Sequence, residues 1–182
     1  MVTDDLDLTL VRQVAQGDSQ ALERLYERHG LPLLNYIIGQ VGDRALAEEL
    51  LQNVMLSVWK AAPGFRGESM VRTWLFAIAR NHSINAHRKR KLVNVPLFEA
   101  DGVSKTGPME AMLRNTEKEA VRAALRQLSE EHRETLELIF YHGMSGPEAA
   151  EVLGVSVGTI KSRLHRAKAL LKQVLTKEDS YE

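Results

Sequence analysis

The side chains with the clearest binding chemistry lie near the C-terminus, in residues 157–167, VGTIKSRLHRA. On a helix, Ile160, Leu164 and Ala167 share one face, which leaves cationic and hydroxyl side chains on the other. Arginine and lysine bond the O6 and N7 atoms of guanine, while serine and further cations bond phosphates. The pattern therefore predicts contact with duplex DNA. The residues predicted to face outward are Lys161, Ser162, Arg163, His165 and Arg166.

The residues just before this segment predict a helix-turn-helix. Ser145 is a suitable N-cap, and Pro147 fits the first turn of a short helix because no N–H is needed there. Gly154 supplies the positive φ of a three-residue turn, and Ser156 caps a second helix. A short helix, a glycine turn and a cationic helix form a reader of the major groove. The alternative is a helical hairpin whose cations are merely solvated.

A second group of candidate residues lies between 65 and 91, where aromatic side chains adjoin a basic run. Unpaired bases stack on aromatic rings while their backbone follows positive charge, and asparagine and serine bond base edges. The segment is therefore compatible with single-stranded nucleic acid. Trp74 and Phe76 also fit a helical core, and the spacing of His82 and His87 is poor for binding a metal.

Composition excludes several other kinds of site. The 182-residue chain has no cysteine, which rules out disulfides, cysteine nucleophiles and thiolate metal sites. Its six histidines form no His-Glu-x-x-His motif, and no titratable pair adjoins a nucleophile or a phosphate-binding loop. We therefore expect no enzyme, no metal and no cofactor.

Charge and hydropathy indicate the kind of partner and the compartment. The net charge is zero, yet residues 61–91 hold seven cations and one acid, and residues 157–182 hold six cations and three acids. Two basic blocks suggest two contacts with a polyanion, although such clustering also arises by chance. No apolar run approaches the ~20 residues of a membrane span, and the N-terminus is acidic. We expect a cytoplasmic soluble protein without stable membrane insertion.

The elements that must position these residues are all predicted to be helices, since no long stretch alternates between apolar and polar residues. The sequence predicts an all-α protein with two small helical domains, residues 1–91 and 116–182. Proline and glycine at high density predict a flexible linker over residues 92–115. The expected helices are about 19–29, capped by Asp18 and ended by Gly30; 43–62, begun by Asp43; 70–91; 116–128; and 130–141, capped by Ser129 and ended by Gly143.

The helix over residues 45–62 has two apolar stripes. One contains Leu46, Leu50, Val54 and Val58, and the other contains Leu51, Met55 and Trp59. This pattern fits a helix that packs on its own core on one side and on a partner protein on the other. It fits equally well a helix with both stripes buried in a bundle.

Taken together, the motifs resemble those of the bacterial extracytoplasmic-function (ECF) sigma factors. Their order is an acidic Leu-Leu-Gln helix, FRGES at 65–69, TWLFAIARN at 73–81, a basic run, a linker and the 157–167 motif. The resemblance covers about residues 6–175. It implies two helical domains that bind core RNA polymerase and recognise promoter DNA. An anti-sigma factor that occludes both domains is a further partner that this family often has.

The resemblance also implies roles for individual residues. The −35 element would be read by Lys161, Ser162, His165 and Arg166, with Arg163 on phosphate. The β′ clamp helices would be bound by Glu49, Gln52, Asn53 and Met55, where Asn53 replaces the acid usual in the family. Residues 129–142 would lie near the β flap. The residues that would capture and melt the −10 element are Phe65, Arg66, Ser69, Trp74, Asn81, Asn85 and Arg88.

Two other classes stay open at this point. A conventional helix-turn-helix regulator would bind duplex DNA without recruiting polymerase, although residues 1–91 lack the strand–helix alternation of an upstream sensor domain. A helical interaction protein with incidental basic patches is the other class.

Overall fold

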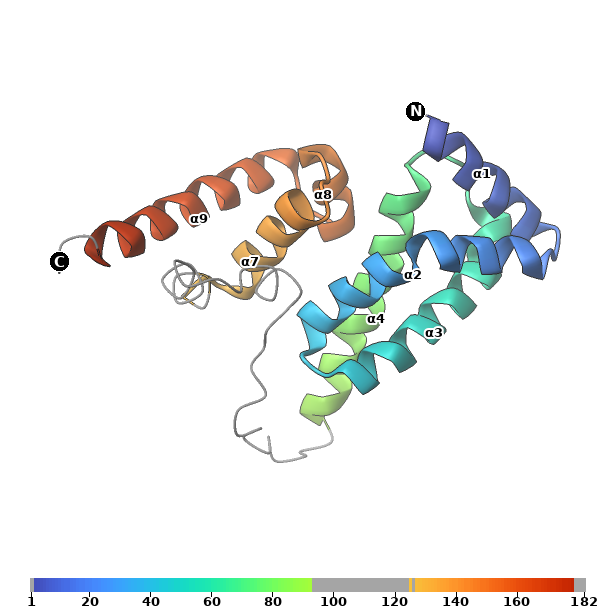
Figure 1. Ribbon diagram of the computed structural model, residues 1–182, viewed down its shortest axis with the longest axis horizontal. Coiled ribbons are helices and arrows are strands. Elements are labelled where there is room, and N and C mark those ends of the chain that lie inside the picture. The colour runs from blue at the N-terminus through green and yellow to red at the C-terminus, as the bar shows by residue number, and fades with distance from the viewer. Residues whose placement is uncertain (1, 93–124, 126, 179–182) are drawn as a thin grey trace. The chain divides into compact units, whose positions relative to one another are not determined.

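The chain divides into two compact units, residues 1–105 and 106–182, and each is described by itself. The computed structural model describes residues 2–92, 125 and 127–178 (Figure 1). Within these ranges every regular element is helical and none is a strand, so the all-α prediction is confirmed. The predicted linker over 92–115 and the predicted helix over 116–128 lie almost wholly outside the described residues.

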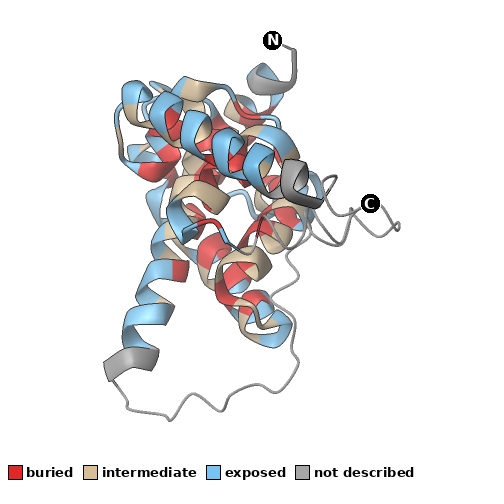
Figure 2. Cartoon of the chain, turned by 90° about the vertical axis from the view of Figure 1, so that its left-hand side faces the viewer, coloured by how far each residue is buried: buried red, intermediate tan, exposed pale blue. Residues whose placement is uncertain are grey.

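The described part of the first unit is built from helices. They are α1 (Val2–Ala15), α2 (Ser19–Val41), α3 (Arg44–Ala61), a 3₁₀ turn η1 (Ala62–Gly64) and α4 (Val71–Leu92). Helix α2 packs against α1, α3 and α4, and its buried side includes Leu25, Leu33 and Tyr36. The ring centroids of Tyr36 and Phe76 lie 5.2 Å apart in this core. Figure 2 shows the buried residues gathered between the helices.

The predicted N-caps of this unit are confirmed, but one predicted helix end is wrong. Asp18 accepts hydrogen bonds from the backbone of Gln20 and Ala21, and Asp43 caps α3 in the same way. Gly30 does not end α2, because it keeps a helical φ beneath the Tyr26 ring, where an added Cβ would lie 3.3 Å from ring atoms. The helix continues to Val41 and ends at Gly42, whose φ is 69°.

Helix α1, for which the sequence analysis gave no bounds, is fixed to α2 by a buried carboxylate. The Asp7 side chain is 6% exposed and lies 2.6 Å from Arg28 Nε and 2.7 Å from His29 Nε2. Two partners compensate the desolvation of this carboxylate, as a buried charge requires. Leu10, Val11 and Val14 complete the contact, so α1 belongs to the core of this unit.

The second unit contains the predicted helix-turn-helix. Helix α7 (Glu130–Leu136) continues as a π-helical segment η3 (Glu137–Tyr141), followed by α8 (Gly146–Leu153) and α9 (Val157–Glu178). Ser145 and Glu148 form a capping box at the start of α8, and Gly154 ends this helix with a φ of 65°. Ser156 caps α9 by accepting a bond from the Thr159 N–H. The cluster beneath α9 consists of Leu125, Leu128, Leu136, Leu164, Ala167 and Leu171.

Candidate nucleic-acid and protein interfaces

The solvent-facing side of α9 carries most of the residues that were predicted to contact duplex DNA. Ile160 and Ala167 are buried, which turns Lys161, His165 and Arg166 toward solvent together with Ser162. Lys161 makes no ion pair with any other described residue. The helix therefore presents cations and hydroxyl groups that duplex DNA could bind.

Arg163 is the exception, and the prediction that it faces outward is wrong. Its side chain is only 15% exposed, and its Nη2 lies 2.8 Å from Glu131 Oε2 at the start of α7. Arg163 is three residues after Ile160 and next to Leu164, so it borders the buried face of α9. The ion pair thus links the recognition helix to α7.

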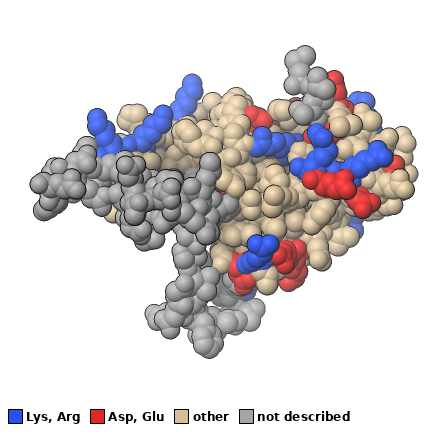
Figure 3. All heavy atoms as spheres, in the orientation of Figure 1, with Lys and Arg blue, Asp and Glu red and all other residues tan. Residues whose placement is uncertain are grey.

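Two further lysines extend the cationic surface beyond the predicted motif. Lys168 and Lys172 are exposed, and they follow Lys161 by seven and eleven residues, so they lie on the same side of α9. Figure 3 shows Lys and Arg side chains projecting along this helix. Neither lysine was predicted, because the predicted motif ended at Ala167, although both follow the helical spacing in the sequence.

Four predicted residues share one face of α4. Trp74, Asn81, Asn85 and Arg88 are spaced by seven, four and three residues, which places them in line on a helix. Asn81, Asn85 and Arg88 are exposed, and Trp74 is half-buried. The structure thus presents an aromatic side chain, two amides and a cation in one row.

The loop before α4 brings a second aromatic side chain to this row. The Phe65 ring lies 4.6 Å from the Trp74 ring, with an interplanar angle of 32°. Arg66 is exposed and lies 3.8 Å from Glu68, and Ser69 is half-buried. Phe76, by contrast, is fully buried, as the core alternative for this residue required.

The interpretation of the second stripe of α3 as partner-facing is wrong. Leu51 is buried and Met55 is only 8% exposed, since α3 packs against α1, α2 and α4. Both stripes lie largely in the bundle, as the alternative held. The apolar residue that does face solvent is Leu56, which is 57% exposed. It follows Glu49 by seven, Gln52 by four and Asn53 by three residues, so it lies on their face of the helix.

Two histidines connect α4 to its neighbours. His82 Nε2 lies 2.8 Å from Ser57 Oγ of α3, and His87 Nε2 lies 2.8 Å from the backbone oxygen of Gln40 in α2. Burial lowers the pKa of His82 below its usual 6.5, because the charged imidazolium is poorly solvated there. No group of three His, Cys, Asp or Glu residues in the described ranges could hold a metal ion.

The lowered pKa of His82 predicts that the first unit loses stability in mild acid. Below pH 6.5 the histidine is protonated more readily in the unfolded chain than in the folded one. The free energy of unfolding therefore decreases as the pH is lowered. The variant His82→Gln should show a shallower fall between about pH 7.5 and about pH 5.5. Urea unfolding followed by tryptophan fluorescence measures it, since Trp59 and Trp74 both lie in this unit. Equal pH dependence in both proteins would contradict the prediction.

Comparison with known proteins identifies both units. The family described as Sigma-70 region 2 matches residues 25–93, and the family described as Sigma-70, region 4 matches residues 118–171. The RNA polymerase sigma-H factor of Pseudomonas aeruginosa is 31% identical over 186 residues, with 96% of each chain covered. The ECF RNA polymerase sigma factor SigL of Mycobacterium tuberculosis is 32% identical over 168 residues, covering 91% of this chain and 94% of SigL.

Solved structures agree with this assignment. The chain is similar to CnrH in its complex with the cytosolic domain of CnrY, with a TM-score of 0.69, 28% identity, and coverage of 94% and 98% of the two chains. It is also similar to the sigma factor RpoE in complex with the anti-sigma factor NepR from Bartonella quintana. That match has a TM-score of 0.63, 28% identity, and coverage of 85% and 96%.

The two matched regions define the class of protein, a sigma-70-type transcription initiation factor. Within this class, the chain belongs to the ECF family of RNA polymerase sigma factors. The resemblance drawn from the motifs is confirmed. The protein is an alternative sigma factor that partners with core RNA polymerase and directs transcription initiation. The conventional regulator is not favoured, because residues 25–93 match a sigma region. None of the described helices has the length and apolar character to cross a membrane.

Proposed function

We propose that this sigma factor binds a promoter through two separate surfaces and has no catalytic activity of its own. One surface is α4 with the loop before it, and the other is α9. The observation that carries the proposal is the row of Trp74, Asn81, Asn85 and Arg88 on α4. We assign residues 1–91 to −10 and polymerase binding, 92–115 to the linker, and 116–182 to −35 binding. Such a protein acts in the cytoplasm, where transcription takes place.

At the −35 element, Lys161, Ser162, His165 and Arg166 are proposed to read the major groove. They occupy the N-terminal half of α9, the part of a recognition helix that contacts base edges. Lys168 lies about 10 Å further along the helix than Lys161, at ~1.5 Å per residue, and Lys172 lies further still. We propose that these two lysines bind phosphates. Arg163, which was predicted on phosphate, is proposed instead to hold α9 against α7 through Glu131.

At the −10 element, the row on α4 is proposed to bind the unpaired strand. The exposed sides of Phe65 and Trp74 offer stacking surfaces, while Asn81 and Asn85 offer hydrogen bonds to base edges. Arg88, which is exposed in the same row, is proposed to bind the strand's phosphates. Arg66 and Ser69 are proposed to support the captured base from the loop.

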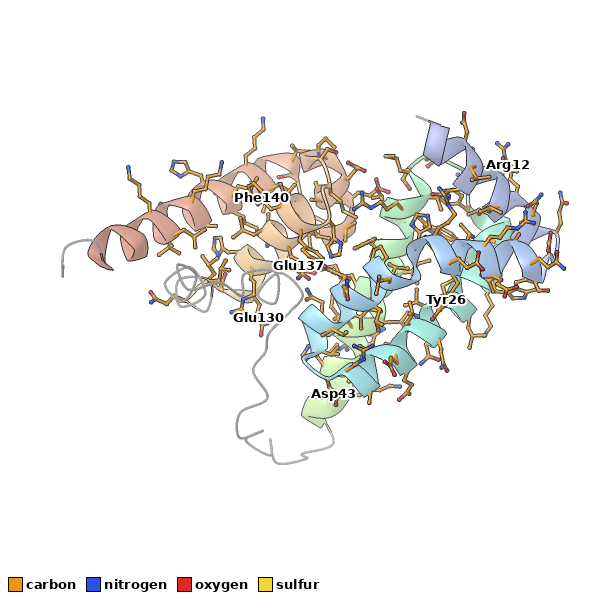
Figure 4. The ribbon with its side chains drawn as sticks, viewed as in Figure 1. Arg12, Tyr26, Asp43, Glu130, Glu137 and Phe140 are labelled. Atoms are coloured by element: carbon orange, nitrogen blue, oxygen red, sulfur yellow. The ribbon has the colours of Figure 1, made fainter. Side chains whose placement is uncertain are left out.

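The polymerase is proposed to bind both units. On α3, the face formed by Glu49, Gln52, Asn53 and Leu56 is proposed to contact the β′ clamp helices, with Met55 supporting that face from the core. In the second unit, residues 129–142 are proposed to contact the β flap. Phe140, labelled in Figure 4, is 62% exposed in η3 and is the apolar anchor for that contact.

An anti-sigma factor is a further proposed partner. CnrH and RpoE, to which this chain is similar, were solved in complex with CnrY and with the anti-sigma factor NepR. Occlusion by such a protein would explain how a chain with exposed DNA-binding faces is kept inactive. Co-purification from the native host would identify it.

Run-off transcription tests the proposed function. The full chain and core polymerase are incubated with sheared genomic DNA of the source organism, and the 5′ ends of the transcripts are sequenced. New start sites that share two upstream elements, and that are absent with core polymerase alone, are expected. Binding to genomic fragments without initiation would instead indicate a conventional regulator and would overturn the proposal.

The proposed separation of base contacts from phosphate contacts on α9 gives a second prediction. Arg166→Ala should reduce discrimination between −35 variants by about 1–3 kcal/mol, the contribution of a good base contact. Changing Lys168 and Lys172 to alanine should instead weaken binding to all variants alike and reduce the salt dependence, because phosphate contacts release counterions. Holoenzyme affinities measured over a range of salt concentrations distinguish the two. The same pattern of loss in both variants would refute this assignment.

A further inference from the structure

The C-terminal part of α4 extends beyond the hydrophobic core of its unit. Ser83 is the last buried residue of this helix in the described part of the chain, and residues 84–89 are exposed or half-buried. Figure 1 shows this end of α4 projecting past the connection between α2 and α3. Asn85 and Arg88, which we assign to the −10 strand, lie on this segment. The geometry of the proposed site therefore depends on what holds a helix end without core packing.

A hydrogen bond from His87 helps to hold this end. His87 Nε2 lies 2.8 Å from the backbone oxygen of Gln40, and a carbonyl only accepts, so Nε2 is the donor. Gln40 is in the last turn of α2, where the carbonyls lack partners within the helix. A donor placed there also interacts favourably with the negative end of the helix dipole. Among the described residues 84–89, we find no other hydrogen bond to the rest of the unit.

A second hydrogen bond holds the other flank of the helix where the core still packs. His82 Nε2 lies 2.8 Å from Ser57 Oγ, which ties α4 to α3. His82 and His87 are five residues apart, so they leave α4 on different sides. The two bonds therefore hold the helix against both α2 and α3 and oppose its rotation about its own axis.

His87 also lies off the row that faces the DNA. Asn81, Asn85 and Arg88 repeat at helical spacing, and His87 falls outside that series. The Nε2–H that bonds to α2 is therefore not available to the strand, and the imidazole ring is directed toward α2 rather than along the row. Any effect of His87 on DNA must therefore act through the position of its neighbours.

We propose that His87 is a positioning residue for promoter opening: its bond to the Gln40 carbonyl fixes the angle of the exposed end of α4, so that Asn85 and Arg88 are in place before the strand arrives. The inference rests on the −10 role proposed for this helix. Helix ends with few buried contacts fray readily, and ordering them during binding weakens the complex. Because the His87 bond already orders this helix end in the free protein, the free-energy cost of ordering it does not weaken DNA binding.

The test compares His87→Ala, His87→Gln and Gln40→Ala, each as the full chain assembled with core polymerase. Promoter opening is followed with a fluorescent base analogue in the −10 element. We expect His87→Ala to open the promoter about tenfold more slowly, the effect of one lost hydrogen bond on a rate. Glutamine has an amide donor and should restore part of the rate. Gln40→Ala keeps the backbone oxygen that accepts the bond, so it should open the promoter faster than His87→Ala.

Polymerase affinity and the urea midpoint of the first unit are measured on the same variants. A positioning role leaves polymerase affinity unchanged in His87→Ala while opening slows, and the urea midpoint falls by no more than one lost hydrogen bond accounts for. Normal opening in this variant would overturn the inference, and so would slowing matched by an equal loss of polymerase binding. If the wild-type holoenzyme itself opened no promoter, the proposed −10 role would fail, which is a different result from failure of His87 alone.

Discussion

Leu56→Asp is expected to weaken binding of this sigma factor to core polymerase by at least about tenfold. Burying a leucine side chain contributes about 1.5–3 kcal/mol, and each 1.4 kcal/mol corresponds to a tenfold change in affinity. An aspartate at the same place must also be desolvated without a partner, which adds to the loss. The fold should tolerate the change, since Leu56 is 57% exposed. Equilibrium titration of labelled sigma factor with core polymerase measures the effect.

Leu31→Asp is the matched control. Leu31 is 66% exposed on α2, outside the face formed by Glu49, Gln52, Asn53 and Leu56. The same substitution on the same kind of helix surface should leave polymerase affinity unchanged. Equal losses in both variants, or none in Leu56→Asp, would show that the face on α3 is not the contact.

The start of a helix was predictable wherever a nearby side chain accepts a hydrogen bond from one of the first backbone N–H groups of that helix. Asp18, Asp43, Ser129, Ser145 and Ser156 were predicted as N-caps, and each one accepts a hydrogen bond from the backbone of the helix that follows. These bonds need no tertiary information, because donor and acceptor are two or three residues apart. The same local logic located the glycine turn of the helix-turn-helix.

The end of α2 was not predictable in this way, because two glycines competed for the role. Gly30 resembles a helix end in sequence, yet the Tyr26 ring covers it and the helix continues. Gly42 has the positive φ that ends α2. A glycine in a helix either marks its end or makes room for a neighbouring ring, and only packing distinguishes the two.

The prediction of which site residues are exposed failed at the edges of helix faces. Helical spacing correctly predicted which central residues of the α9 face are exposed, such as Lys161 and Arg166, and Asn81 and Asn85, which the family resemblance singled out, are exposed as well. Residues at a face's border were misplaced, because their exposure depends on how many neighbours a helix has. Met55 is buried since three helices surround α3, and Arg163 is covered because Glu131 reaches it from α7.

The two surfaces proposed to bind DNA also differ in the contacts that hold them in place. Helix α9 lies against α7 and α8 through a buried stripe and the Arg163–Glu131 ion pair, as a rigid reader of duplex DNA requires. The exposed end of α4 depends on a hydrogen bond from His87. Strand opening should therefore be more sensitive than duplex binding to small changes around its site.

Replacing Asn81 and Asn85 together with aspartate is expected to slow promoter opening by at least about thirtyfold. Aspartate matches asparagine in shape, so the exposed helix should keep its fold, but two amide donors become two negative charges facing phosphates. Two lost contacts of about 1 kcal/mol or more each correspond to at least about a thirtyfold change in rate. Opening is measured with the −10 base analogue, beside titration with core polymerase.

Gln16→Glu with Gln20→Glu is the matched control for this double variant. Gln16 is exposed in the turn between α1 and α2, and Gln20 is exposed in the first turn of α2; the paired change adds the same charge to the first unit without altering α4. This control should open promoters normally, since neither residue belongs to the row on α4. Equal slowing in both pairs would mean that net charge, rather than the face of α4, sets the rate. Unimpaired opening in the aspartate pair would remove Asn81 and Asn85 from the site.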